Sequence, residues 1–208
     1  MLNFQNSFQR KEQLKYRIVP VDSTMVAETC NKLTKGLSPG SKKDKTSGKV
    51  VKQVKYTVAF DGLTACDFEV FTDSSYTSEE LAIPEVIRLN ASKEGSNTNI
   101  YTFDRGVTCT KTFSSFNKDE ISFVGRLRIP RKYDVIASDQ LSEDNKDLGE
   151  LTLISSQLVH LYGNVKLDQE NTYRLIIAEH KEKIDTTPPR NKGRFRKKEN
   201  TFNFLPII

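Results

Sequence analysis

Short runs of alternating apolar and polar residues make up most of this chain, and they predict β-strands. The clearest run begins at Val50 and ends at an Asp61-Gly62 turn. Within it, apolar side chains point one way and polar ones the other: Val54, Tyr56, Val58 and Phe60 against Gln53, Lys55 and Thr57. This alternation is typical of a strand with two different faces.

Eight other segments carry weaker strand signals: 13–19, 65–72, 86–89, 99–103, 107–113, 121–129, 151–162 and 172–180. Asp104-Arg105-Gly106 is interpreted as the turn of a hairpin between two of them. Ser78-Glu79-Glu80-Leu81 could open a helix, but Pro84 would interrupt it, so a short turn followed by a strand is expected there.

One helix is predicted at about residues 23–36, with Asp22 or Ser23 as its cap and Gly36 near its end. Val26, Cys30, Leu33 and Leu37 would share its apolar face. The polar loop 38–48 follows it.

These elements predict an all-β fold, an eight- or nine-stranded antiparallel sandwich of jelly-roll type with one short helix. The alternative is a β-barrel. Residues 1–187 would form one β domain, partly irregular over 1–48. Residues 188–208 would form a basic C-terminal strap with an apolar end.

The segment near the C-terminus is strongly basic. The chain has 32 Lys and Arg against 27 Asp and Glu, and Arg190–Asn200 holds six basic residues and one acidic one, which leaves 26 against 26 elsewhere. Such a strap suits a polyanion, and nucleic acid is the expected one, DNA or RNA. The proposed contacts in the strap are Arg190, Lys192, Arg194, Arg196, Lys197 and Lys198, with Phe195 stacking on a base.

A second basic segment lies in the body of the chain. Arg126 and Arg128 are predicted to point outward from a strand, and Arg131 and Lys132 follow its end. These four residues could form one edge of a nucleic-acid groove, or they could protect an edge strand by charge.

Catalytic and metal-binding signatures do not emerge from the sequence. His160 and His180 are 20 residues apart, and the Gly40–Thr46 loop lacks the second glycine of a phosphate-binding loop. The three cysteines are widely spaced, which fits neither a disulfide framework nor a metal knuckle. We therefore expect no enzyme activity, cofactor, metal or small-molecule substrate. We also expect an intracellular, unsecreted protein without membrane contact.

The run Phe123-Val-Gly-Arg-Leu-Arg-Ile-Pro-Arg-Lys-Tyr133, followed by the predicted strands 151–162 and 172–180, resembles the C-terminal half of small single-jelly-roll capsid proteins. Such proteins occur in small single-stranded DNA viruses and satellite-like viruses. The resemblance implies an eight-stranded sandwich that packs into a closed shell, with basic arms facing the enclosed nucleic acid. The location would then be the virion.

The end of the chain is apolar after its basic strap. An exposed apolar terminus promotes aggregation, so residues 201–208 are expected to be buried as a short edge strand. The strand would cross to another copy of the chain through Phe202, Phe204, Leu205, Ile207 and Ile208, or pack on its own sheet.

The function expected from the sequence is thus a self-assembling, capsid-type subunit that contacts nucleic acid through basic terminal segments. The alternative is a free-standing single-stranded nucleic-acid-binding module with an OB-like barrel, in which Tyr56, Tyr101 or Phe103 stack on bases. A third possibility is a regulatory protein whose basic tail only docks on another protein or directs nuclear import.

Overall fold

The computed structural model describes ten stretches of the chain: residues 16–27, 53–62, 64–94, 98–104, 106–127, 131–142, 147–149, 151–163, 166–180 and 201–205. It is mostly β, which confirms the fold class expected from the alternating runs. The basic residues of the strap, Ile207 and Ile208 lie outside the described residues, as does Arg128. Most of the predicted helix 23–36 also lies outside them.

The first half of the chain forms a five-stranded sheet with two helices. Three strands come first, β1 (Arg17–Ala27), β2 (Gln53–Phe60) and β3 (Ala65–Phe71), and pair antiparallel. Then follow α1 (Glu79–Glu94), β4 (Asn99–Phe103), α2 (Thr110–Lys118) and β5 (Ser122–Arg126). Both β1 with β4 and β4 with β5 pair in parallel, so the expectation of a purely antiparallel sandwich is wrong at these two pairings.

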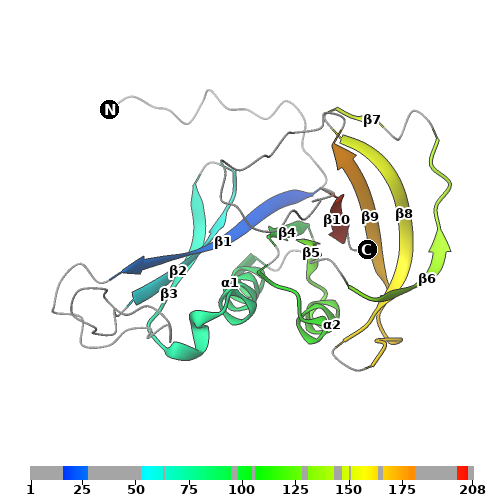
Figure 1. Ribbon diagram of the computed structural model, residues 1–208. Helices are drawn as coiled ribbons and strands as arrows, with labels where there is room; N and C mark the ends of the chain where they lie inside the picture. Colours follow the sequence, from blue (N-terminus) through cyan, green and yellow to red (C-terminus); the bar gives the residue numbers. More distant parts are fainter. Residues whose placement is uncertain are drawn as a thin grey trace, which may run out of the picture.

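The second half is an antiparallel sheet. It contains β6 (Tyr133–Ser138), β7 (Asp147–Leu148), β8 (Leu151–Leu161) and β9 (Tyr173–His180). β10 (Thr201–Leu205) lies between β9 and β5 and joins the two halves, which gives the strand order β3-β2-β1-β4-β5-β10-β9-β8-β6 (Figure 1). β10 therefore has a neighbour on both sides, so the prediction of an edge strand is wrong.

Both helices lie on the same side of the sheet (Figure 1), and the core fills the space between. Apolar side chains of α1 and α2 meet those of the strands in one continuous cluster, which includes Ile83, Ile87, Phe113, Phe116 and Phe123. The rings of Phe113 and Phe123 are stacked, with their centroids 5.1 Å apart. Gly125 on β5 leaves room for the ring of Phe103, because a Cβ there would lie 2.6 Å from that ring.

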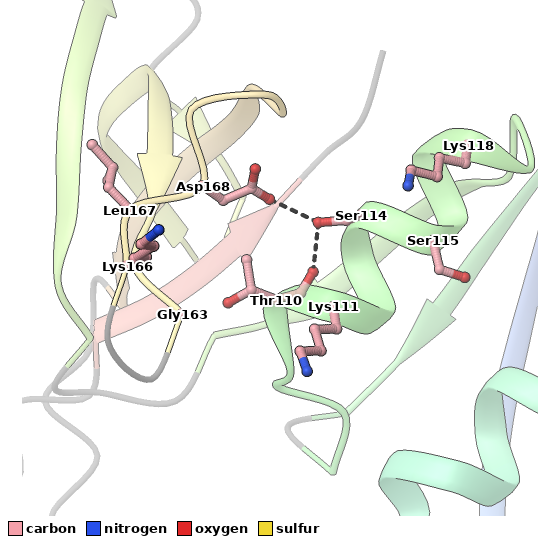
Figure 2. Close-up of a pocket in the computed structure, with 9 residues that line it drawn as sticks. All are labelled: Thr110, Lys111, Ser114, Ser115, Lys118, Gly163, Lys166, Leu167 and Asp168. Carbon is pink, nitrogen blue, oxygen red and sulfur yellow. Dashed lines mark hydrogen bonds between the residues drawn. The ribbon is translucent and has the colours of Figure 1, made fainter.

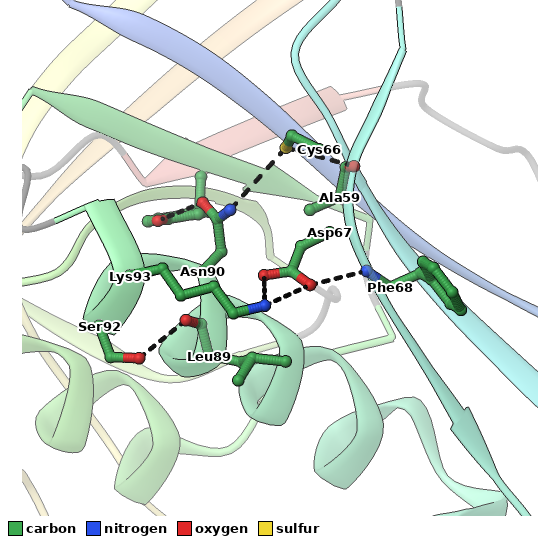
Figure 3. Close-up of polar contacts among 9 residues, drawn as sticks. Ala59, Cys66, Asp67, Phe68, Leu89, Asn90, Ser92 and Lys93 are labelled. Carbon is green, nitrogen blue, oxygen red and sulfur yellow. Dashed lines mark hydrogen bonds and ion pairs between the residues drawn. The ribbon is translucent and has the colours of Figure 1, made fainter.

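Polar contacts fix α1 on β3 (Figure 3). Lys93 of α1 donates to both carboxylate oxygens of the buried Asp67, at 3.0 and 2.9 Å. Asn90 accepts a hydrogen bond of 2.9 Å from the buried hydroxyl of Tyr101. These contacts satisfy polar groups inside the core, so they stabilise the fold.

Three predicted elements are wrong. Residues 23–27 belong to β1, so Asp22 and Ser23 lie in a strand and cap no helix. Residues 86–89 belong to α1, which contains Pro84 and offsets its lost hydrogen bond by burying Ala82, Ile83, Val86 and Ile87. Residues 110–113 open α2, where Phe113 and Phe116 share the buried face, so Asp104 and Gly106 precede a helix and not the second strand of a hairpin.

The two faces of β2 are the reverse of what hydrophobicity suggests. The polar side chains of Gln53, Lys55 and Thr57 are buried on the helix side, whereas Tyr56 and Phe60 are 38% and 41% exposed on the other side. Lys55 is accommodated by donating to the carbonyl oxygen of Thr77, at 2.7 Å. Its burial lowers the pKa of its ammonium group from 10.5, and Glu79 opposes that effect.

Candidate functional site

Three charged residues lie at or just beyond the parallel pairing of β1, β4 and β5. Asp22 lies in β1, Asp104 directly follows β4, and Arg126 is the last residue of β5. The parallel register of β1 and β4 ends with Pro20 paired to Thr102, so each aspartate lies two residues beyond the last pair. β1 itself continues to Ala27, paired with β2.

Asp22, Asp104 and Arg126 lie on the sheet face that the helices leave open. In β1 and β4 the buried residues Val19, Val21, Tyr101 and Phe103 face the helices, so residues of the opposite parity face away from them. The Asp104 side chain is 67% exposed, and the nearest guanidinium nitrogen of Arg126 is 3.9 Å from its carboxylate. This long ion pair leaves carboxylate oxygens accessible to a ligand.

The loop after Asp104 is held by Glu80 of α1. The Glu80 carboxylate accepts hydrogen bonds from the backbone N–H of Thr108, at 2.7 Å, and of Cys109, at 3.0 Å. It also accepts one from the Thr112 hydroxyl at 2.9 Å. Because α2 begins at Thr110, this carboxylate satisfies donors at the helix start and places the loop that carries Asp104.

Arg131 joins the two halves of the molecule. Its guanidinium group donates to the carbonyl oxygens of Thr108 and Tyr162 and to the hydroxyl of Thr110. Burial lowers its pKa, although Cys109 and Glu80 oppose that effect. The structure thus commits Arg131, predicted as a nucleic-acid contact, to protein oxygens.

A pocket of about 360 Å³ lies between α2 and the loop that follows β8 (Figure 2). One face of α2, Gly163 and residues 166–168 line it. The lining residues include three lysines, Lys111, Lys118 and Lys166, and one acid, Asp168. The pocket was not found from the sequence, because its lysines lie 55 residues apart at the extremes, in segments that were predicted as a strand and a loop.

The other residues predicted to contact nucleic acid or another subunit differ in their exposure and in the elements that carry them. Lys132 is exposed, just before β6. Phe202, Phe204 and Leu205 lie in β10, which pairs with β5 and β9 of the same chain. Tyr101 and Phe103 are 1% and 7% exposed, so the prediction that they stack on bases is wrong, whereas Tyr56 lies on the open face.

Sequence reasoning missed the Asp22 and Asp104 pair. A signal was present, because each aspartate follows a mostly apolar run, Ile18-Val-Pro-Val before Asp22 and Ile100-Tyr-Thr-Phe before Asp104. The parallel pairing of the two runs is needed to see that both aspartates follow the same last pair, Pro20 and Thr102.

Within the described stretches, no three His, Cys, Asp or Glu side chains gather in a cluster that could hold a metal. The described helices are also too short or too polar to cross a membrane. No protein-family model matches the chain, and no curated protein matches it.

Proposed function

We propose that this protein acts on nucleic acid, holding a Mg²⁺ ion between Asp22 and Asp104 to cleave or transfer a phosphodiester. The observation that carries the proposal is the parallel register of β1 and β4, in which Asp22 and Asp104 each lie two residues beyond the last pair, Pro20 and Thr102. A register continued by two residues would place the two aspartates on neighbouring strands, about 4.8 Å apart. Ligands of open parallel sheets bind outside the carboxyl ends of the strands, where Asp104 lies.

The side chains fit this ion. Mg²⁺ prefers oxygen ligands and is usually held by one or two carboxylates together with waters and substrate phosphates. Asp22 and Asp104 are both exposed, so they can supply the carboxylates while leaving coordination positions for a phosphate. Arg126, beside them, offers a fork of donors that matches the oxygens of a phosphate.

Each residue then has a definite task. Asp22 and Asp104 would hold the ion, and Glu80 keeps the loop after Asp104 in place. Arg126 orients the phosphate and balances its charge. The bound ion supplies Lewis acidity that stabilises charge on the attacking and leaving oxygens.

The basic strap Arg190–Asn200 supports the choice of nucleic acid as substrate. Its six cations supply affinity that does not depend on base sequence. Deleting the strap should weaken the binding of single-stranded DNA and lower the logarithmic salt slope by about four.

A strand-cleavage assay tests the proposal. Supercoiled plasmid and labelled duplex DNA are incubated with the protein and Mg²⁺ or Mn²⁺, with EDTA as the blank. Asp22→Asn and Asp104→Asn should each lower the rate at least 100-fold. Asp134→Asn is the matched control, because Asp134 is an exposed aspartate whose carboxylate accepts from the Tyr162 hydroxyl on the far sheet. Equal rates for all three variants would contradict the proposal.

A second candidate is the self-assembling, capsid-type subunit implied by the sequence resemblance. The observation that favours it is β10, which fills a slot between β5 and β9 that the same segment of another copy could occupy. The parallel pairs of β1, β4 and β5 give no support to its jelly-roll sandwich.

Light scattering separates the two candidates. Truncation after Asn200 should lower the oligomeric state while the protein remains folded, if copies exchange β10. An unchanged mass, or a truncated chain that unfolds as a monomer, would mean that β10 packs on its own sheet.

A further inference from the structure

The lysine pocket between α2 and the β8–β9 loop carries a net positive charge (Figure 2). Lys111 and Lys118 come from α2, and Lys166 comes from the loop. In the part of the chain that the structure describes, these three ammonium groups take part in none of the ion pairs. Three cations around one hollow repel one another unless an anion lies between them.

Asp168, the single acid of the pocket, is engaged elsewhere. Its carboxylate accepts hydrogen bonds from the Ser114 hydroxyl at 2.7 Å and from the Asn171 side chain at 3.1 Å to each oxygen. Burial alone would raise the pKa of this carboxyl group, but these hydrogen bonds outweigh it and the pKa is lowered. Asp168 therefore stays charged, orders the loop against α2, and leaves the lysines available.

Backbone contacts hold the loop in this shape. The Gly163 N–H donates to the carbonyl oxygen of Lys166 at 2.7 Å, and the Asp168 N–H donates to Leu161 at 2.9 Å. The Thr110 hydroxyl donates to the carbonyl oxygen of Tyr162, at 3.3 Å. The pocket is thus built before a ligand arrives, which lowers the entropy cost of binding.

The positive charge comes from side chains and not from the start of α2. The Glu80 carboxylate already accepts the hydrogen bonds of the Thr108 and Cys109 N–H groups there. A ligand of the pocket would instead meet the ammonium groups and the Ser115 hydroxyl along the helix face, because the Ser114 hydroxyl already donates to Asp168. Ammonium and hydroxyl donors together suit a phosphate group.

We propose that this pocket binds a backbone phosphate of nucleic acid, at a contact on the helix side of the sheet, opposite the face that carries Asp22 and Asp104. The inference rests on the proposed function for its substrate class, and it adds a second contact on different elements. Lys111, Lys118 and Lys166 supply the charge, and the contact is independent of base sequence.

Binding measurements in EDTA test the pocket apart from the metal. A labelled 20-base-pair duplex is titrated with the full chain at several salt concentrations between 50 and 200 mM. Each of Lys111→Ala, Lys118→Ala and Lys166→Ala should reduce the logarithmic salt slope by about 0.9, and the triple variant by about three times as much. Lys111→Arg should keep the slope of the wild type.

The control is Ile136→Glu, which lowers the net charge by one at an exposed position of β6, outside the pocket lining. Its slope should stay at the wild-type value. If Ile136→Glu lowers the slope as much as the lysine variants do, the net charge of the protein explains the slope and the proposal of a phosphate in the pocket is wrong. Unchanged slopes in the lysine variants would overturn it as well.

Two further results separate this inference from the proposed function. Inorganic phosphate at millimolar concentration should compete with the duplex in the wild type but not in the triple variant; equal competition in both would place the bound phosphate elsewhere. If the lysine variants lower the slope while no Mg²⁺-dependent cleavage is found, the pocket stands and the carboxylate proposal fails. If Asp22→Asn abolishes cleavage but the lysine variants keep the wild-type salt slope, the carboxylate proposal stands and the pocket fails.

Discussion

The two faces of the β1–β5 sheet differ in what their residues do. The face under α1 and α2 is closed, and even its polar residues are buried, such as Lys55 and Thr57 at 2% and 0% exposure. The opposite face exposes large apolar side chains, including Ile18 at 55% and Phe68 at 61%, and carries Asp22 and Asp104 at its edge. Apolar burial on the first face stabilises the fold, whereas the second face exposes apolar area among the described residues.

This comparison predicts that the same substitution affects different properties on the two faces. Residues on the covered face should affect stability, and residues on the open face should affect binding or activity.

A matched pair of phenylalanines gives the largest difference. Phe123→Ala removes a ring with 0% exposure that contacts the rings of Phe103, Phe113 and Phe116, so the free energy of unfolding should fall by about 3–5 kcal/mol. Phe68→Ala removes a ring with 61% exposure and should change it by less than about 0.5 kcal/mol. Urea denaturation measures both, and equal losses would mean that the open face is covered.

Arg131 should behave as a residue of the covered side. Arg131→Ala removes the donor to the carbonyl oxygens of Thr108 and Tyr162, which costs about 1–3 kcal/mol because buried acceptors lose their partner. Lys132→Ala, its exposed neighbour, should cost less than about 0.5 kcal/mol. A loss of DNA affinity in Arg131→Ala with unchanged thermal stability would restore Arg131 as a nucleic-acid contact.

Lys55→Met should have the smallest effect on stability. The direction in which this effect changes with pH follows from the lowered pKa of Lys55. The folded protein holds this proton less tightly than the unfolded chain, whose lysine has a pKa of 10.5. The unfolded state therefore binds more protons between the two pKa values, and stability rises with pH through that window. Wild type should gain stability relative to Lys55→Met as the pH rises toward 10.5, as followed by thermal denaturation. If wild type instead loses stability relative to Lys55→Met as the pH rises, the effect of Glu79 outweighs that of burial.

Much of the strand pattern could be predicted from the sequence, since alternation located β2, β3, β4, β8 and β9 closely. The helices could not. Pro84 interrupts the sequence signal of α1, but four buried side chains, Ala82, Ile83, Val86 and Ile87, outweigh it in the fold. In α2 the window Val107–Phe113 is too short to separate a period of 2 from one of 3.6.

The candidate site was harder to predict for a different reason. Asp22 and Asp104 are 82 positions apart, and only the parallel register of β1 with β4 shows that each lies two residues beyond the same pair. Alternation tells which residues share a face of one strand, but it does not tell which strands are neighbours. The inverted faces of β2 have the same origin, because the position of α1 decides which side is buried.

The most direct test of the central claim is a count of bound Mn²⁺, a stand-in for Mg²⁺, by electron paramagnetic resonance in the absence of nucleic acid. The account predicts that wild type binds one ion that Mg²⁺ displaces. The Asp22→Asn, Asp104→Asn double variant should lose this ion while keeping the wild-type melting temperature, and Asp134→Asn should keep it. An equal number of bound ions in the double variant and the wild type would contradict the claim that the two aspartates hold the metal.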